Sequence, residues 1–98
     1  MKSFNERCYI ILKKVPKGKI TTYNAIAKKL NSKAYSAVGN AMNKNPYAPN
    51  VPCHRVIRSD GTIGDFASGP IAKIKILKKE GIEIKKGKID LKKYEYKL

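Results

Sequence analysis

The chain has 98 residues, the size of one domain, and its 42% hydrophobic share excludes wholesale disorder. No apolar stretch approaches the length of a membrane span and no signal segment precedes the first helical pattern, so we expect a soluble cytoplasmic protein with one domain over residues 1–98. Its 22 lysines and arginines against 7 acidic residues give a net charge of +15. This excess favours a nucleic-acid partner over the alternative that the lysines serve only solubility.

Apolar residues at helical spacing predict helices on either side of the Pro16 break. The first begins at the capping box of residues 3–6 and stops at Pro16. Thr21 or Thr22 can cap the second, which ends at Asn31. Each of these helices therefore has a recognisable start and stop in the sequence.

A third predicted helix runs from about Ser32 to Lys44 on small apolar residues. Gly39 inside it costs about 1 kcal/mol against alanine, so we expect a neighbouring helix to approach closely there. Two short helices joined by a tight polar turn have the shape of a helix-turn-helix, a pattern that many bundles without DNA-binding function share.

The segment 43–52 is rich in proline and asparagine and leads into the run Cys53–Arg58. Asp60-Gly61 is a hairpin turn signal, with Thr62-Ile63 as a short return strand.

A fourth helix is predicted from Pro70 through Glu80, where Gly81 ends it, and the tail is expected to form a small ribbon or an irregular wrap. The predicted fold class is α+β and mostly α: a winged helix-turn-helix-like domain with a short β-hairpin.

The neighbours Cys53 and His54 carry the chemistry that the sequence suggests. A cysteine is a nucleophile only as the thiolate, which a nearby base or cation favours. Adjacent side chains of an extended segment point apart, so His54 would act through a water, with Glu80 as a candidate orienter of its ring. A buried structural cysteine beside a surface histidine fits these residues equally well. Cys8 lies on an apolar helix stripe as a core residue, and neither a disulfide nor a metal site is expected.

Several motifs occur in order along the whole chain: Thr22-Tyr23, Ala37–Met42, Asn45-Pro46, Pro52–Val56, Gly64, Lys73–Leu77 and Glu80-Gly81. In this set and spacing the chain resembles the O6-alkylguanine-DNA alkyltransferases (methylated-DNA–protein-cysteine methyltransferases) over their C-terminal DNA-binding and active-site domain. The resemblance implies a winged helix-turn-helix that enters the minor groove of DNA and rotates the damaged base into a pocket, since only flipping exposes an atom inside the stack.

By position match, the resemblance implies roles for individual residues. Cys53 would be the acceptor thiolate, His54 would relay its proton through water, and Glu80 would hold the imidazole. Tyr23 would hydrogen-bond the guanine and crowd the target phosphate, and Asn45 would brace the active-site turn. The other expected DNA contacts are Thr22, Tyr35, Ser36, Asn40 and Arg55. The expected substrate pocket comprises Val56, Phe66, Ala67 and Ser68.

The chain departs from the family pattern at some positions. The family's usual N-terminal domain has no counterpart in these 98 residues, and Ala67 stands where the family commonly has a serine. Ser36 stands where the third helix normally carries an arginine that fills the gap left by the flipped base. Tyr35 is large enough to replace it, but lies about 100° further round the helix.

The sequence therefore predicts irreversible transfer of an alkyl group from O6-alkylguanine in double-stranded DNA to Cys53, by a monomer with no cofactor, no metal and no membrane partner. The site of action would be the cytoplasm, nucleoid-associated in a prokaryote, or the nucleus in a eukaryote. The alternative is an alkyltransferase-like sensor that binds the lesion without reacting. Such relatives lack the cysteine, so the presence of Cys53 favours alkyl transfer. The absence of the arginine at Ser36 leaves the sensor as an alternative. A plain winged-helix regulator would explain the charge but not the Pro-Cys-His-Arg run.

Overall fold

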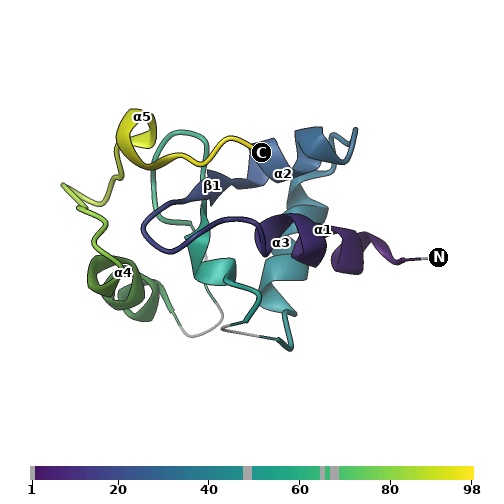
Figure 1. Ribbon diagram of the computed structural model, residues 1–98, viewed down its shortest axis with the longest axis horizontal. Helices are drawn as coiled ribbons and strands as arrows, with labels where there is room; N and C mark the ends of the chain where they lie inside the picture. Colours follow the sequence, from purple (N-terminus) through teal and green to yellow (C-terminus); the bar gives the residue numbers. More distant parts are fainter. Residues whose placement is uncertain (1, 48–49, 65, 67–68) are drawn as a thin grey trace.

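The computed structural model describes residues 2–47, 50–64, 66 and 69–98. Its elements are α1 (Phe4–Leu12), β1 (Thr21–Thr22), α2 (Tyr23–Lys29), α3 (Tyr35–Asn43), the 3-10 helix η1 (Cys53–Arg55), β2 (Val56–Ile57), α4 (Pro70–Lys79) and α5 (Leu91–Tyr94). Helices α1, α2 and α3 gather at one end of the molecule, and α4 and α5 lie at the other (Figure 1). This arrangement confirms the predicted α-rich α+β class.

Side-chain caps fix the starts of α1 and α2. The Ser3 hydroxyl accepts a hydrogen bond from the Glu6 amide and donates one to the Glu6 carboxylate, both at 3.2 Å, which completes the predicted capping box. Thr22, rather than Thr21, caps α2, because its hydroxyl accepts from the Ala25 amide at 3.0 Å. Thr22 is buried with its hydroxyl engaged in this cap, a position that favours a structural role over the predicted DNA contact.

Helix α3 begins at Tyr35 rather than at the predicted Ser32, and packs on α1 and α2 through its buried face. The close helix approach predicted at Gly39 is wrong, because no heavy atom outside its own helix and chain neighbours lies within 4 Å of the position that a Cβ would take there. Gly39 instead lines an open groove, together with Tyr35 and Asn40. Helix packing therefore does not explain this glycine.

The sheet differs from the predicted hairpin in its pairing. The turn forms at Asp60-Gly61, with the Gly61 amide donating to the Arg58 carbonyl at 3.0 Å. However, β2 pairs in parallel with β1, and Thr62 makes only an isolated bridge with Lys88. The parallel pairing sets the start of α2 beside the segment that follows Cys53.

Among the described residues, the core consists of two apolar clusters that adjoin at β2. The first lies among α1, α2 and α3 and includes Cys8, Leu12, Ile26, Val38, Cys53 and Val56. The second contains Ile20, Ile57, Ile63, Leu77, Ile82, Ile89 and Tyr94. Because the neighbours Val56 and Ile57 belong to different clusters, the segment that carries Cys53 is anchored on both sides.

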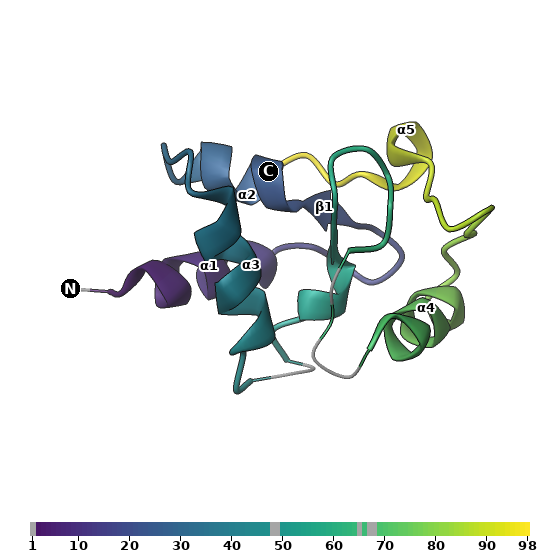
Figure 2. The ribbon, with the colours of Figure 1, turned by 180° about the vertical axis from the view of Figure 1, so that it is seen from behind.

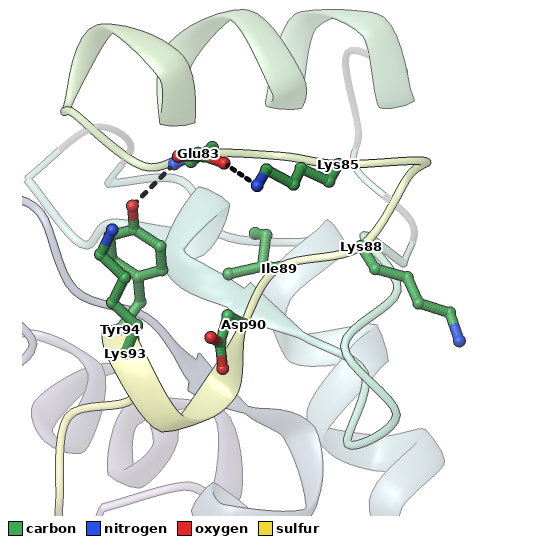
Figure 3. A pocket seen from close by; sticks show the side chains of 7 residues that line it. All are labelled: Glu83, Lys85, Lys88, Ile89, Asp90, Lys93 and Tyr94. Atoms are coloured by element: carbon green, nitrogen blue, oxygen red, sulfur yellow. Dashed lines mark hydrogen bonds and ion pairs between the residues drawn. The ribbon is translucent and has the colours of Figure 1, made fainter.

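The C-terminal tail wraps back along the start of β1, as an irregular segment with the short helix α5. The Ile20 amide donates to the Tyr94 carbonyl at 2.9 Å, and the Tyr96 amide donates to the Ile20 carbonyl at 2.8 Å. A pocket of about 370 Å³ lies in this tail. The Tyr94 hydroxyl accepts from the Glu83 amide at 3.1 Å there, and Glu83 pairs with Lys85, as Figure 3 shows. Within the described residues, no helix has the length and apolar character needed to cross a bilayer.

Candidate active site and adjoining groove

Cys53 begins η1 and is 7% exposed, packed with the cluster of the first helices. Asn45 fixes the segment before it: its side-chain amide donates to the Val51 carbonyl at 2.7 Å, and its side-chain oxygen accepts from the Tyr47 amide at 2.9 Å. These contacts tie Val51, which precedes Pro52 and Cys53, to Asn45, which is the geometry that a bracing role for Asn45 requires.

His54 and Arg55 converge on Glu80, the residue that ends α4. Nε2 of His54 lies 3.0 Å from Oε2 of Glu80, a hydrogen-bonding distance, although its N–H is not aligned on the oxygen. Arg55 donates from Nε to Oε1 at 2.9 Å and from Nη2 to Oε2 at 2.6 Å, and its Nη1 donates to the Val15 carbonyl at 3.0 Å. The arginine fork therefore fixes the carboxylate that faces His54.

Arg55 makes its hydrogen bonds to groups inside the protein. Its side chain is largely buried and its donors serve Glu80 and Val15. This placement favours support of the histidine–glutamate pair over the predicted contact with DNA.

Burial sets the protonation of this cluster. Burial lowers the pKa of His54 and the positive charges of Arg55 and Lys73 add to this, although Glu80 works in the opposite direction. Burial alone would raise the pKa of Glu80, but the hydrogen bonds from Arg55 and the charges of His54 and Arg55 outweigh it and hold that pKa below its ordinary value. At neutral pH the pair is therefore a neutral imidazole beside a carboxylate, able to accept a proton and to stabilise the cation that forms.

A fully buried lysine links α4 to the residues predicted to meet the substrate. Nζ of Lys73 donates to the Val56 carbonyl at 2.6 Å and lies 3.5 Å from the Tyr23 hydroxyl, 5.7 Å from the centre of that ring. Sequence reasoning assigned Lys73 no role beyond its place in a motif. The spacing of Lys73 to Leu77 could have indicated its burial, because the two residues share the inward face of α4.

A groove of about 550 Å³ opens between α2, α3 and the turn after β2, and Figure 2 shows α3 and this turn on one face. Tyr35, 47% exposed, lines it with Ser36 and Asn40, three of the predicted DNA contacts. The remaining lining residues are Tyr23, Asn24, Gly39, Asn43, Arg58, Ser59 and Asp60. Tyr23 thus connects the groove to Lys73, whereas Cys53 does not line it.

The predicted substrate-pocket residues are only partly described. Val56 is buried and presents its carbonyl to Lys73. Phe66 is half-buried against the cluster that holds Cys53. Ala67 and Ser68 lie outside the described residues. Among the residues that the structure describes, no group of histidine, cysteine, aspartate and glutamate could hold a metal ion.

The fold and the site define a small α-rich domain in which a buried cysteine is followed by a histidine that faces a glutamate. Tyr23 and Lys73 link this region to an open groove beside a pair of short helices. Residues 3–82 match the family described as 6-O-methylguanine DNA methyltransferase, DNA binding domain, and the chain belongs to this family. The match confirms the resemblance inferred from the motifs.

Curated relatives are longer than this chain. A bifunctional methyltransferase/endonuclease of Picrophilus torridus is 42% identical over 89 residues, which cover 90% of this chain and 30% of that protein. A methylated-DNA–protein-cysteine methyltransferase of Methanosarcina acetivorans is 47% identical over 79 residues, 80% of this chain and 51% of the relative. The chain thus spans about half the length, or less, of these relatives.

Solved structures share the fold. Atl1 of S. pombe, crystallised in complex with damaged DNA containing O6-carboxymethylguanine, has a TM-score of 0.87 and 32% identity over 100% of both chains. The O6-methylguanine-DNA methyltransferase of Pyrococcus kodakaraensis strain KOD1 has a TM-score of 0.75 and 43% identity, covering 84% of this chain and 48% of that one. These similarities confirm the predicted fold class.

Proposed function

We propose that this chain repairs DNA by transferring an alkyl group from O6 of guanine in double-stranded DNA to Cys53, once per molecule. The observation that supports the reaction most directly is the buried His54 held against Glu80, immediately after Cys53 in η1. Because the curated relatives are longer, activity of residues 1–98 alone, as a monomer, is part of the proposal.

The proposed step needs only a thiol, a base and a positioned substrate. The Cys53 thiol loses its proton through a water to His54, and Glu80 stabilises the imidazolium that forms. The sulfur then attacks the alkyl carbon. A carbon–sulfur bond forms while the carbon–oxygen bond breaks, and its electron pair stays with the guanine, which takes up a proton. The thioether product has no evident route back, so the thiolate is consumed and no cofactor or metal is required.

The substrate side of the proposal rests on Tyr23 and Lys73. A hydroxyl that accepts from an ammonium group becomes a better donor, because hydrogen bonds polarise one another in a low-dielectric interior. With Lys73 Nζ 3.5 Å from its hydroxyl, Tyr23 is suited to donate to an extruded base at the inner end of the groove. Extrusion is needed because the alkylated oxygen lies inside the base stack.

Intact-mass measurement after incubation with an O6-methylguanine duplex tests the proposal. We expect one added methylene increment on the peptide that carries Cys53 and none on the peptide that carries Cys8. Burial raises the pKa of the Cys8 thiol to about 11, so Cys8 stays protonated and provides an internal control. Cys53→Ala should abolish the transfer and Cys8→Ala should preserve it. An unmodified wild-type protein bound to the lesion would contradict the transfer.

A non-reacting lesion sensor is the second candidate, and a specific observation favours it. The S. pombe Atl1 structure matches this chain over its full length, and that protein was crystallised with O6-carboxymethylguanine DNA. Under this alternative the lesion is bound tightly while Cys53 stays unmodified. Cys53 favours transfer, because non-reacting relatives are expected to lack it.

Binding to undamaged DNA should depend strongly on salt. The charge of +15 cannot all face one duplex, so we expect about four to six phosphate contacts and a log–log salt slope of roughly −3.5 to −5.5. Fluorescence anisotropy over a salt series measures this slope. A flat salt response would show that the basic excess serves another purpose.

A further inference from the structure

We propose that Arg58 contacts a backbone phosphate of the DNA strand that carries the alkylated guanine, from the wall of the groove opposite α3. The inference rests on the proposed DNA binding and adds to it a contact that the sequence motifs do not contain. The resemblance places an arginine on α3, where this chain has Ser36. Arg58 and Ser36 line the same groove. The groove therefore has an arginine, but it comes from the turn after β2 instead of from α3.

The two walls of the groove differ in charge. The residues that α2 and α3 contribute are uncharged, and α3 contains no charged residue along its length from Tyr35 to Asn43. The turn after β2 contributes Arg58, Ser59 and Asp60. Arg58 is therefore the one cation among the described residues that line the groove, although a strand lying in it would carry a negative charge at every nucleotide.

The turn that carries Arg58 is held in place by backbone and side-chain hydrogen bonds. The Arg58 amide donates to the Thr62 carbonyl at 3.0 Å, and the Ile89 amide donates to the Gly61 carbonyl at 2.9 Å. The Asn24 side chain donates to the Ser59 hydroxyl at 3.1 Å, which ties the turn to α2 across the groove. A preorganised turn reduces the entropy lost when the arginine side chain binds.

Asp60 offsets the charge of Arg58, so the proposed phosphate contact depends on the geometry of the guanidinium group. Its carboxylate accepts from the Thr62 hydroxyl at 2.7 Å and from the Thr62 amide at 2.9 Å, and these hydrogen bonds lower its pKa, so it is ionised at neutral pH. The charges of Arg58 and Asp60 cancel, so the turn does not attract DNA by net charge. Arg58 then acts through its planar fork, which matches a phosphate with two parallel hydrogen bonds.

Salt titrations on an undamaged duplex test the contact. We expect Arg58→Ala to reduce the steepness of the log–log slope by about 0.9 and to weaken binding roughly tenfold. Arg58→Lys should keep the slope but bind more weakly than wild type, because it loses the fork. Lys78→Ala removes the same charge from an exposed position on α4, at the other end of the molecule, and should leave the slope unchanged. Arg58→Gln, with thermal melting of each variant, separates loss of the contact from disturbance of the turn.

Single neutral methylphosphonate linkages around the O6-methylguanine locate the phosphate. At one or two linkages near the lesion, neutralisation should weaken wild-type binding without weakening Arg58→Ala any further. Identical slopes for wild type and Arg58→Ala, or equal sensitivity of both to every linkage, would overturn this inference alone. Failure of the wild type to bind DNA at all would overturn the proposed function, and the inference with it.

Discussion

Replacing His54 with alanine is expected to slow alkyl transfer to Cys53 by roughly 10²–10⁴-fold while leaving DNA affinity unchanged, because a positioned acid–base group accelerates proton transfer by about that factor. The imidazole is buried against Glu80 and neutral near pH 7, so it can take the thiol proton as the sulfur attacks. Single-turnover quench experiments with a saturating O6-methylguanine duplex measure the rate. Equal rates for His54→Ala and wild type at neutral pH would rule the relay out.

The pH profile separates a proton relay from a packing role. In wild type the depressed pKa of His54 keeps the base neutral below the ordinary histidine value of 6.5, so the rate should fall only at a lower pH. Without the imidazole, transfer relies on thiolate formed in solvent, and the rate should rise more steeply with pH. A variant whose rate is lower at every pH by one constant factor would indicate a structural role instead.

The same burial links His54 to stability. The folded protein disfavours the imidazolium, so the unfolded chain binds more protons than the folded protein does as the pH falls below about 6.5. The depressed pKa of Glu80 acts in the same direction at lower pH, since its stabilising contribution is lost as the carboxylate protonates below the ordinary value of 4.5. The free energy of unfolding should therefore decrease on acidification, first through His54 and then through Glu80.

Local features of the fold were predictable because their causes are local. The capping box at Ser3, the cap at Thr22 and the turn at Asp60-Gly61 each depend on residues within a few positions. The parallel pairing of β1 with β2 was not predictable, because it joins segments separated by α2, α3 and η1, and neither strand is long enough to show a periodicity.

The candidate site was predicted unevenly for a similar reason. Motif order identified Cys53, His54 and Glu80, and the structure brings His54 and Glu80 together. The resemblance assigned Arg55 to DNA as the arginine of the family motif. Its orientation toward Val15 and Glu80 depends on how α1 and α4 pack. The burial of Lys73 is likewise a tertiary property that its residue type argues against.

Lys73 offers a way to separate packing from electrostatics. A buried ammonium group is costly unless it is well hydrogen-bonded, and replacing buried charge with an apolar side chain of similar volume is often neutral for stability. Truncating the same fully buried side chain leaves a cavity and removes the donor from the Val56 carbonyl. The consequences for folding and for the groove residue Tyr23 should therefore differ between the two replacements.

Lys73→Ala is expected to lower the free energy of unfolding by about 2–5 kcal/mol, whereas Lys73→Met should change it by less than about 2 kcal/mol. Lys73→Met should nevertheless slow alkyl transfer about tenfold or more, because Tyr23 and the Val56 carbonyl both lose the group that polarises and orients them. Lys75→Met, exposed on the same helix, should alter neither quantity. Urea denaturation and single-turnover rates measured on the same preparations provide both readouts. A Lys73→Met protein that is as stable as wild type and transfers at the wild-type rate would show that this lysine contributes packing alone.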